Sequence, residues 1–446
     1  MRRGAYILAA LVCFAWMTGC GGRRGLPETE QPVGSRGVLT LAWTESQPVE
    51  ALRTLVRAYE TQSLVRVQIA AYPDADYHDQ IILHFEQRYT QFDLYAIMSH
   101  WRAAHVRNRY ALDISDFLKR EVSLTGVPPA LRAISGEYPP GSALYVAAPF
   151  FPNPLIFLYR KDWFEDPAEQ RAFEQQTGRP LAAPATWEHT FEVARFFQRP
   201  DENRYGISVP LSRDFRGLIY VWPHLLMAHG GQLADPDIYR VRGHIDSEHA
   251  RAALNDLKTL LTLSPPGAAE ATQERALLQF LQGQTAMAIA PYSLARGIKR
   301  TMGDDVGFAP LPAGPGGHAA LIPGFGIAVS NQLPLEQEEL ALDFLRWFMQ
   351  RDTQAQWMTL SGAAIYEEHL ASDAFYEASA APEAYHHALE HGQTLWDVYV
   401  YLECMRLIQQ HVGDALDGYK PVDKALADLA DEASSLLRGE GLLKEF

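Results

Sequence analysis

Cysteine is scarce in this chain, with 3 in 446 residues: Cys13, Cys20 and Cys404. Cys13 lies in an N-terminal apolar stretch and Cys20 closes it, so Cys404 is the one thiol left for the folded part. We therefore expect a fold without internal disulfides, stabilised by its core, with Cys404 as a small buried residue. Basic residues are also in the minority, because 39 Lys and Arg oppose 54 Asp and Glu for a net charge of −15. This balance argues against a nucleic-acid partner and against electrostatic adhesion to anionic lipid.

Several functional signatures are missing as well. No stretch of 18 or more apolar residues follows the N-terminal one, so we expect nothing to span a membrane after it. The chain has no serine-hydrolase elbow, phosphate-binding loop or dinucleotide-binding glycine pattern. His387-Ala-Leu-Glu-His391 matches an inverted zinc-protease motif, but zinc needs a third protein ligand and a supporting second shell. We expect surface histidines there, with no metal and no cofactor.

The N-terminus carries the most informative pattern. Arg2 and Arg3 precede an apolar run of about a dozen residues, too short for a membrane span of roughly 20. Met17-Thr18-Gly19-Cys20 follows, and the whole segment resembles a bacterial lipoprotein signal. The resemblance implies that 1–19 is removed, that Cys20 carries the lipid, and that 20–37 is a flexible tether. The protein would then be anchored outside the cytoplasm, in the periplasm or on the outer face of the cell membrane. The alternatives are an uncleaved anchor and an ordinary secretory signal.

The hydrophobic pattern predicts an α/β protein. Strands at 38–43, 65–70 and 92–98 alternate with helices at 48–63 and 77–89, which favours a mostly parallel sheet covered by helices. Ligands of such sheets bind outside the carboxyl ends of the strands. Farther along we expect helices at 247–263, 272–282, 335–350 and from 394 to the C-terminus, and strands at 286–290, 306–312 and 325–330.

Local motifs from residue 38 to about 430 resemble, in their order, family 1 of the extracellular solute-binding proteins, the sugar receptors of ABC importers. The motifs are Asp93 to Trp101, Leu155 to Lys161, Pro184-Ala-Thr-Trp187, Tyr220 to Gly231, Phe280 to Met287, Val306 to Pro312 and Gly324 to Ser330. The resemblance implies a two-lobed periplasmic-binding-protein fold, with two mostly parallel sheets flanked by helices and joined by a three-segment hinge.

We expect the chain to cross between lobes near 145–150, 313–323 and 362–370. The first lobe would comprise 38–147 and 320–366, and the second lobe 148–319 and 367–446. The family resemblance further implies a monomeric, non-enzymatic protein that binds a carbohydrate or related polyol. It would deliver this solute to the membrane permease subunits of an ABC importer, while the N-terminal lipid holds it to the membrane.

Sugars need aromatic surfaces for their C–H faces and polar side chains for their hydroxyls. The family resemblance singles out Tyr292, Trp396 and Trp101 as stacking residues. The further candidates for ligand contact are Trp43, Glu45, His100, Asn153, Trp222 and Phe325. Each aromatic among them could instead be a core residue.

Other functions stay open at this point. One alternative is an extracytoplasmic carbohydrate-active lipoprotein hydrolase, which would need two convergent carboxylates. Another is the ligand-binding component of a sensor. Within the family the ligand could also be a monosaccharide or a glycerol phosphate, for which Arg102 and Arg296 are possible contacts.

Overall fold

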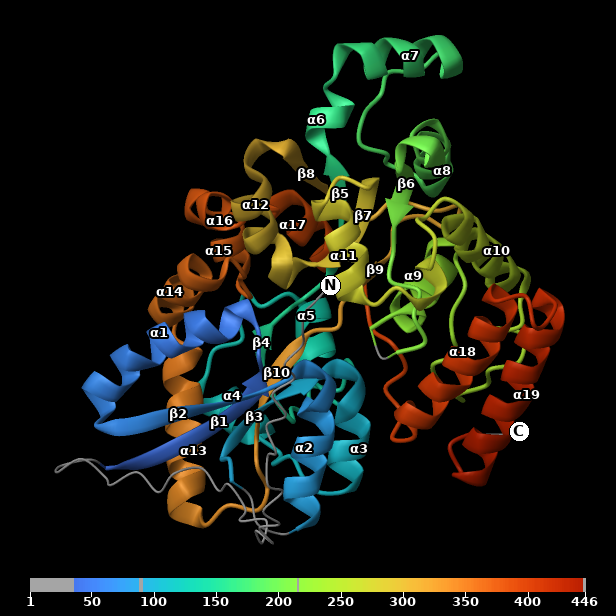
Figure 1. Cartoon of the computed structure of the whole chain (residues 1–446). Helices are drawn as coiled ribbons and strands as arrows, with labels where there is room; N and C mark the ends of the chain where they lie inside the picture. Colours follow the sequence, from blue (N-terminus) through green and yellow to red (C-terminus); the bar gives the residue numbers. More distant parts are fainter. Residues whose placement is uncertain (1–35, 88–90, 215, 444–446) are drawn as a thin grey trace, which may run out of the picture.

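The computed structural model describes residues 36–87, 91–214 and 216–443. The predicted signal peptide, Cys20 and nearly all of the tether lie outside these residues. Two lobes stand one above the other in Figure 1, each built around its own β-sheet. Among the described residues, no helix is both long and apolar enough to cross a membrane.

The first lobe contains a five-stranded sheet. Its order is β2 (Val65–Tyr72), β1 (Gly37–Thr44), β3 (Leu94–Met98), β10 (Phe325–Val329) and β4 (Ala148–Phe151). β1 is parallel to β2 and β3, whereas β10 is antiparallel to both of its neighbours. Four strands therefore run in one direction, and the late strand β10 runs between them in the other.

Helices before and after these strands complete the first lobe. They are α1 (Gln47–Ser63), α2 (Asp74–Glu86), α3 (Arg102–Arg107), α4 (Ser115–Glu121), α5 (Pro129–Ser135), α13 (Leu335–Phe348) and α14 (Arg351–Ser361). The predicted strand–helix alternation at the start of the chain is confirmed. The apolar face that the sequence predicts for α1 is buried, since Leu52, Leu55, Val56 and Tyr59 are at most 4% exposed. In Figure 1, α13 passes behind β1 and β2.

The second lobe contains a four-stranded sheet. Its order is β6 (Tyr205–Ser208), β7 (Thr285–Pro291), β5 (Leu155–Arg160) and β8 (Val306–Ala309). β6 and β7 are parallel, and β5 is antiparallel to both of its neighbours. The surrounding helices are α6 (Lys161–Phe164), α7 (Pro167–Thr177), α8 (Trp187–Phe196), α11 (Gln273–Leu281), α12 (Ala295–Met302) and α17 (Pro382–Glu390).

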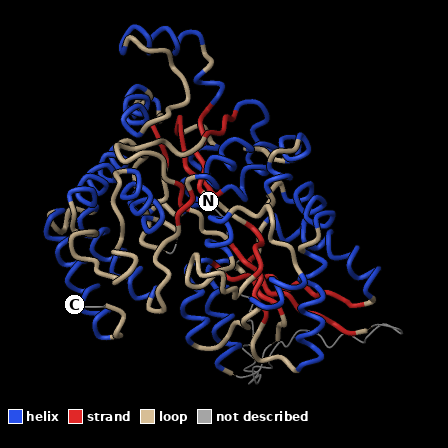
Figure 2. The backbone as a smooth tube through the Cα atoms, turned by 180° about the vertical axis from the view of Figure 1, so that it is seen from behind, coloured by secondary structure: helices blue, strands red, loops and turns tan. Residues whose placement is uncertain are grey.

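Four helices form a separate layer of the second lobe beside α3. They are α9 (Leu218–Ala228), α10 (Glu248–Thr262), α18 (Tyr401–Leu416) and α19 (Val422–Gly439), and they pack on one another. Figure 2 shows this group from behind, next to the C-terminus. The expectation of a helix from residue 394 onward is wrong in its start, because 394–400 is not helical. Asp397 in this stretch is instead bound to the first lobe.

The lobes are connected through short crossings. β4 ends the first sheet at Phe151 and β5 begins the second at Leu155, so only 152–154 lie between the two strands. We assigned 148–151 to the second lobe. These 4 residues form β4, which pairs with β10 and so belongs to the first sheet. A second crossing follows β8 and contains β9 (Ala320–Leu321), which pairs in parallel with β11 (Gly392–Gln393). α15 (Glu367–Leu370) and α16 (Asp373–Ala378) lie next to α14, before α17 reaches the second sheet. The boundaries of the lobes stay a prediction.

One buried ion pair ties the first lobe to the segment that leads into α18. Arg102 on α3 donates from Nη2 to Oδ2 of Asp397 at 2.8 Å, and the two side chains are 0% and 8% exposed. The backbone N–H of Ala103 donates to the other carboxylate oxygen of Asp397. Two charges at this depth stabilise a fold only while both are present.

We expect Asp397→Asn to lower the free energy of unfolding by about 3 kcal/mol, because it leaves the Arg102 charge buried without its partner. Chemical denaturation measures the change. Asp116→Asn is the control, since it removes an exposed i,i+4 pair with Arg120 whose side chains are 82% and 76% exposed. An exposed pair contributes little, so the control should change stability by less than about 0.5 kcal/mol. Equal effects of the two substitutions would contradict the assignment.

Candidate functional site

A cavity lies where strand ends of the two sheets face each other. Its volume is about 110 Å³. The ends of β1, β3 and β4 contribute residues from the first lobe, and the end of β7 and the start of β5 contribute residues from the second. The lining residues are Trp43, Thr44, Glu45, Ser46, Pro48, Asp74, Met98, Phe151, Asn153, Leu155, Arg216, Tyr220, Gln273, Pro291, Ser293, Leu294, Pro323 and Phe325. The cavity thus lies at strand ends, which is where the sequence predicts a ligand site.

Aromatic rings form one wall of this first cavity. The ring of Trp43 lies 5.9 Å from those of Phe151 and Phe325, at steep angles. Behind them, Phe150 and Trp357 continue the aromatic packing into the core of the first lobe. Trp43 is only 1% exposed, and within the described part of the chain its Nε1 has no hydrogen-bond partner. The wall is therefore rigid and apolar, with one buried donor that an added acceptor could satisfy.

Polar groups face the aromatic wall from the crossing segment and from loop ends. Asn153 accepts a hydrogen bond at Oδ1 from the backbone N–H of Ser293 at 2.9 Å, which fixes the orientation of its amide. The amide nitrogen of Asn153 is then the group available to donate to a ligand. Glu45, directly after β1, is exposed and can accept hydrogen bonds. This cavity can thus bind a molecule with both C–H surface and hydroxyl groups.

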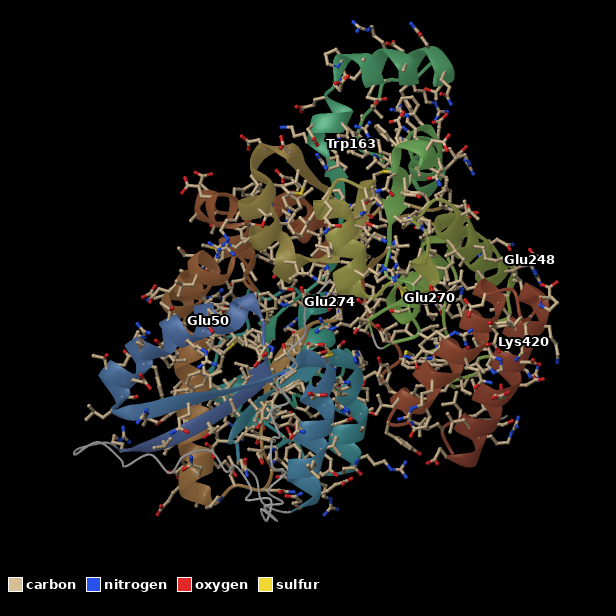
Figure 3. All side chains as sticks on the ribbon, in the orientation of Figure 1. Glu50, Trp163, Glu248, Glu270, Glu274 and Lys420 are labelled. Carbon is tan, nitrogen blue, oxygen red and sulfur yellow. The ribbon has the colours of Figure 1, made fainter. Side chains whose placement is uncertain are left out.

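A second cavity of about 280 Å³ adjoins the first. It is lined by Asp74, His78, Asp79, Trp101, Asp214, Arg216, Glu274 and Leu402. The rings of Trp101 and His78 lie 4.3 Å apart. Figure 3 shows Glu274 at the end of α11 that faces the first lobe. Leu402 lies near the start of α18, so this helix also lines the second cavity.

Burial controls the charges of the second cavity. Burial lowers the pKa of His78 to about 4, so its imidazole is neutral at pH 7. Burial also raises the pKa of Asp74, Arg216 opposes this rise, and Glu274 adds to it. Four carboxylates surround the cavity against one guanidinium, so its lining is acidic.

Five of the nine predicted ligand residues line these two cavities: Trp43, Glu45, Asn153 and Phe325 the first, and Trp101 the second. The remaining four, His100, Trp222, Tyr292 and Trp396, line neither. Strand-end placement accounts for the first group, and the other four are used elsewhere.

Packing and hydrogen bonding explain the four that lie elsewhere. His100 is 1% exposed and packs with its ring 4.2 Å from that of Tyr401, and burial lowers its pKa. Trp222 is fully buried inside α9. Tyr292 donates to the carbonyl of Gly362, and its hydroxyl lies 2.6 Å from that of Ser379.

Trp396 lines a different groove of about 480 Å³, together with Tyr138 and Tyr239. The two arginines considered for phosphate binding also form contacts with other protein groups. Arg102 pairs with Asp397, and Arg296 donates to the carbonyl of Leu360. Neither arginine lines the first or the second cavity.

The polar cavity residues that sequence reasoning missed include Asp74, Arg216, Gln273 and Glu274. All four lie at or just before helix starts, in α2, α9 and α11. Thr272 caps α11 by accepting a hydrogen bond from the N–H of Arg275. Cap residues can be recognised in the sequence. Helix starts that follow strands could therefore have been used to predict these cavity residues.

The histidine motif at the end of α17 gains a neighbour in the structure. The ring of His318 lies 4.4 Å from that of His387 and 5.2 Å from that of His391. Among the described residues, no group of three or more His, Cys, Asp or Glu is arranged to hold a metal ion.

The chain is similar to known proteins in sequence and in fold. A family model described as "Bacterial extracellular solute-binding protein" matches residues 43–355. A search of curated proteins found no match. Maltose-bound MalE3 of T. maritima is 22% identical with a TM-score of 0.74, and the match covers 90% of this chain and 100% of that one.

Two further solved structures cover the chain to a similar extent. An ABC transporter solute-binding protein of Agrobacterium radiobacter K84 in complex with ribitol is 21% identical with a TM-score of 0.76, over 90% of this chain and 99% of that one. One of Agrobacterium vitis S4 with bound D-mannitol is 16% identical with a TM-score of 0.72, over 91% and 99%. At these identities the similarity shows the two-lobed fold.

The buried imidazole of His78 predicts a loss of stability in acid. In the unfolded chain a histidine has a pKa near 6.5, whereas His78 has a pKa of about 4 in the fold. Between these values the unfolded chain binds a proton that the folded chain does not, so the free energy of unfolding falls as the pH falls. We expect His78→Gln to reduce the loss between pH 7 and pH 4.5 by about 2 kcal/mol.

Urea denaturation at the two pH values measures this difference. His386→Gln, at an exposed position on α17, is the control and should leave the loss as it is in the parent protein. If His78→Gln and the parent lost the same stability in acid, the buried neutral imidazole would be the wrong description.

Proposed function

Because the chain belongs to the bacterial extracellular solute-binding protein family, we propose that it binds a carbohydrate or related polyol and delivers it to an ABC importer. The observation that supports this most directly is the pair of adjoining cavities lined by both lobes. Their walls combine Trp43, Phe325 and Trp101 with carboxylates and the amide of Asn153. This is the combination that a polyhydroxylated ligand needs. The relatives bound to maltose, ribitol and D-mannitol lend further support.

The proposed mechanism is hinged closure. A ligand between the lobes contacts both of them only when the lobes are closed, so it binds the closed state more tightly and shifts the population toward it. The short crossings at 152–154 and around β9 and β11 are the segments that would bend. The permease subunits would then recognise the closed form. The solute is released unchanged, since the protein acts as a monomeric receptor and not as an enzyme.

The size of the cavities narrows the ligand class. Volumes of about 110 and 280 Å³ lie at or below the low end of roughly 300–1,000 Å³ that is usual for small-molecule sites. A linear polyol or a sugar of one or two rings suits this space better than a long oligosaccharide. The acidic lining favours hydroxyl donors over glycerol phosphates, which would be repelled.

The N-terminal segment completes the proposal. Cleavage after residue 19 and lipidation of Cys20 would place the receptor outside the cytoplasm at a membrane surface. The family of the chain is extracellular by description, which fits this location. Because the protein carries a net negative charge, anionic lipid headgroups do not attract it, and the acyl chains would supply the anchoring.

A panel of sugars and polyols tests the binding function. We expect maltose, ribitol, D-mannitol or a related compound to raise the melting temperature of the purified protein, because a ligand that binds only the folded state stabilises it. Calorimetry should then show that Trp101→Ala weakens binding of the best compound about tenfold or more. The recovered sugar should be chemically unchanged.

Trp163→Ala is the matched control, since Trp163 lies far from the cleft in the second lobe (Figure 3). It should leave the affinity unchanged. A panel without any binder would contradict the carbohydrate proposal. Hydrolysis of an oligosaccharide would instead favour the hydrolase alternative, with its catalytic carboxylates among those of the second cavity.

Cys20→Ser tests the anchor separately. In a bacterial host that processes lipoproteins, we expect the parent protein in the membrane fraction and the variant outside it, because the thiol that would carry the lipid is missing. Fractionation followed by mass spectrometry of the N-terminus measures both properties. A parent N-terminus without cleavage and without lipid would contradict the proposal.

A further inference from the structure

One ion pair spans the cleft between the lobes. Asp74 is the first residue of α2 in the first lobe, and Arg216 lies two residues before α9 in the second. Nη2 of Arg216 and Oδ1 of Asp74 are in direct contact, with the two side chains only 28% and 20% exposed. The pair therefore joins two helix starts that are far apart in the chain, at a depth where water screens the charges weakly.

Both partners are held in place by their own lobes. Thr44, at the end of β1, forms a side-chain hydrogen bond with Asp74. On the other side, Asp214 accepts hydrogen bonds from the hydroxyl of Ser212 at 2.7 Å and from the backbone N–H of Arg216 at 2.9 Å. Gly217 completes this turn, and a Cβ at that position would lie 1.9 Å from the carbonyl oxygen of Ser212. The turn thus fixes the backbone from which Arg216 extends.

The pair also lies where the two cavities meet. Asp74 and Arg216 are the two residues that the linings of both cavities share. Among the described residues, Arg216 is the one lysine or arginine that lines either cavity. A contact at this position connects the lobes directly over the space in which the ligand is proposed to bind.

From this geometry we infer that the Asp74–Arg216 pair is a latch, which holds the two lobes together over the cleft before any ligand is bound. The inference rests on the proposed function and deepens it, because it describes what controls access to the same site. Opening the lobes separates the two charges and removes the contact. Removing one partner favours the open state, since it removes the attraction between two partly buried charges that only the closed state provides.

Another ion pair between the lobes provides the control. Arg107 on α3 and Glu440 after α19 are 3.9 Å apart, and their side chains are 52% and 40% exposed. An exposed pair of this kind contributes little. Glu440→Gln therefore removes one negative charge from an interlobe contact, as Asp74→Asn does, without affecting the latch.

Single-molecule energy transfer between the lobes tests the latch without a ligand. Dyes on Glu50→Cys in α1 and Glu248→Cys in α10 report the lobe separation, because both positions are exposed and lie on different lobes (Figure 3). Cys13 and Cys20 are replaced by serine, and Cys404 is fully buried, so it does not react with the dyes. We expect Asp74→Asn and Arg216→Gln to shift the distribution toward longer distances, and Glu440→Gln to leave it unchanged.

The charge reversal Asp74→Arg with Arg216→Asp should restore the short distance, which a general loss of structure would not allow. Unchanged distances in both single variants that melt like the parent would overturn the latch, as would equal shifts for Glu440→Gln. The readout needs no ligand, so a sugar panel without a binder would contradict the proposed function and leave this test intact. With a bound panel compound, Asp74→Asn should weaken binding about 5- to 150-fold, the usual range of coupling between two equilibria.

Discussion

The guanidinium of Arg102 is the group on which the arrangement of the cleft depends. It is fully buried, and its nitrogens donate to the carbonyls of Ser99, Ala133 and Glu137 and to the carboxylate of Asp397. These partners belong to the end of β3, to α5 and the loop after it, and to the approach to α18. One side chain thereby connects the segment after β3 with the segment that leads into α18. A buried charge has to be compensated on all sides, and this compensation joins three segments that are distant in the sequence.

The cleft itself follows from the sheet topology. Both sheets present strand ends and helix starts toward the same space, so loops, caps and exposed backbone groups gather there, while the strands and helices fill the two cores. Aromatic residues next to strand ends serve two purposes at once. Trp43 belongs to the core through Phe150 and Trp357, and to the cavity wall through Phe151 and Phe325. The cavity wall is rigid because it is the outer layer of a packed interior.

Much of the fold could be predicted from the sequence, because periodicity reports which side of an element is buried. The strand–helix alternation and the buried face of α1 are local features, and the structure confirms them. The residues of the candidate site could be predicted only in part. Trp43 was predicted because it lies at a strand end, and Asn153 because it lies in the segment that crosses between the lobes. Tyr292 and Trp396 have side chains equally suited to stacking on a sugar. Tyr292 instead contacts Gly362 and Ser379, and Trp396 lines the groove around Tyr138. Such contacts join residues far apart in the sequence, and no local pattern encodes them.

The position of β10 has a consequence for how the chain is made. This strand lies between β3 and β4 in the first sheet, although some 170 residues of the second lobe separate it from β4 in the sequence. During synthesis, β3 and β4 have no neighbour on that side until residues 325–329 have left the ribosome. The N-terminal half therefore cannot complete its sheet early. A chain exported through a narrow channel, as proposed above, would stay unfolded longer because of this delay.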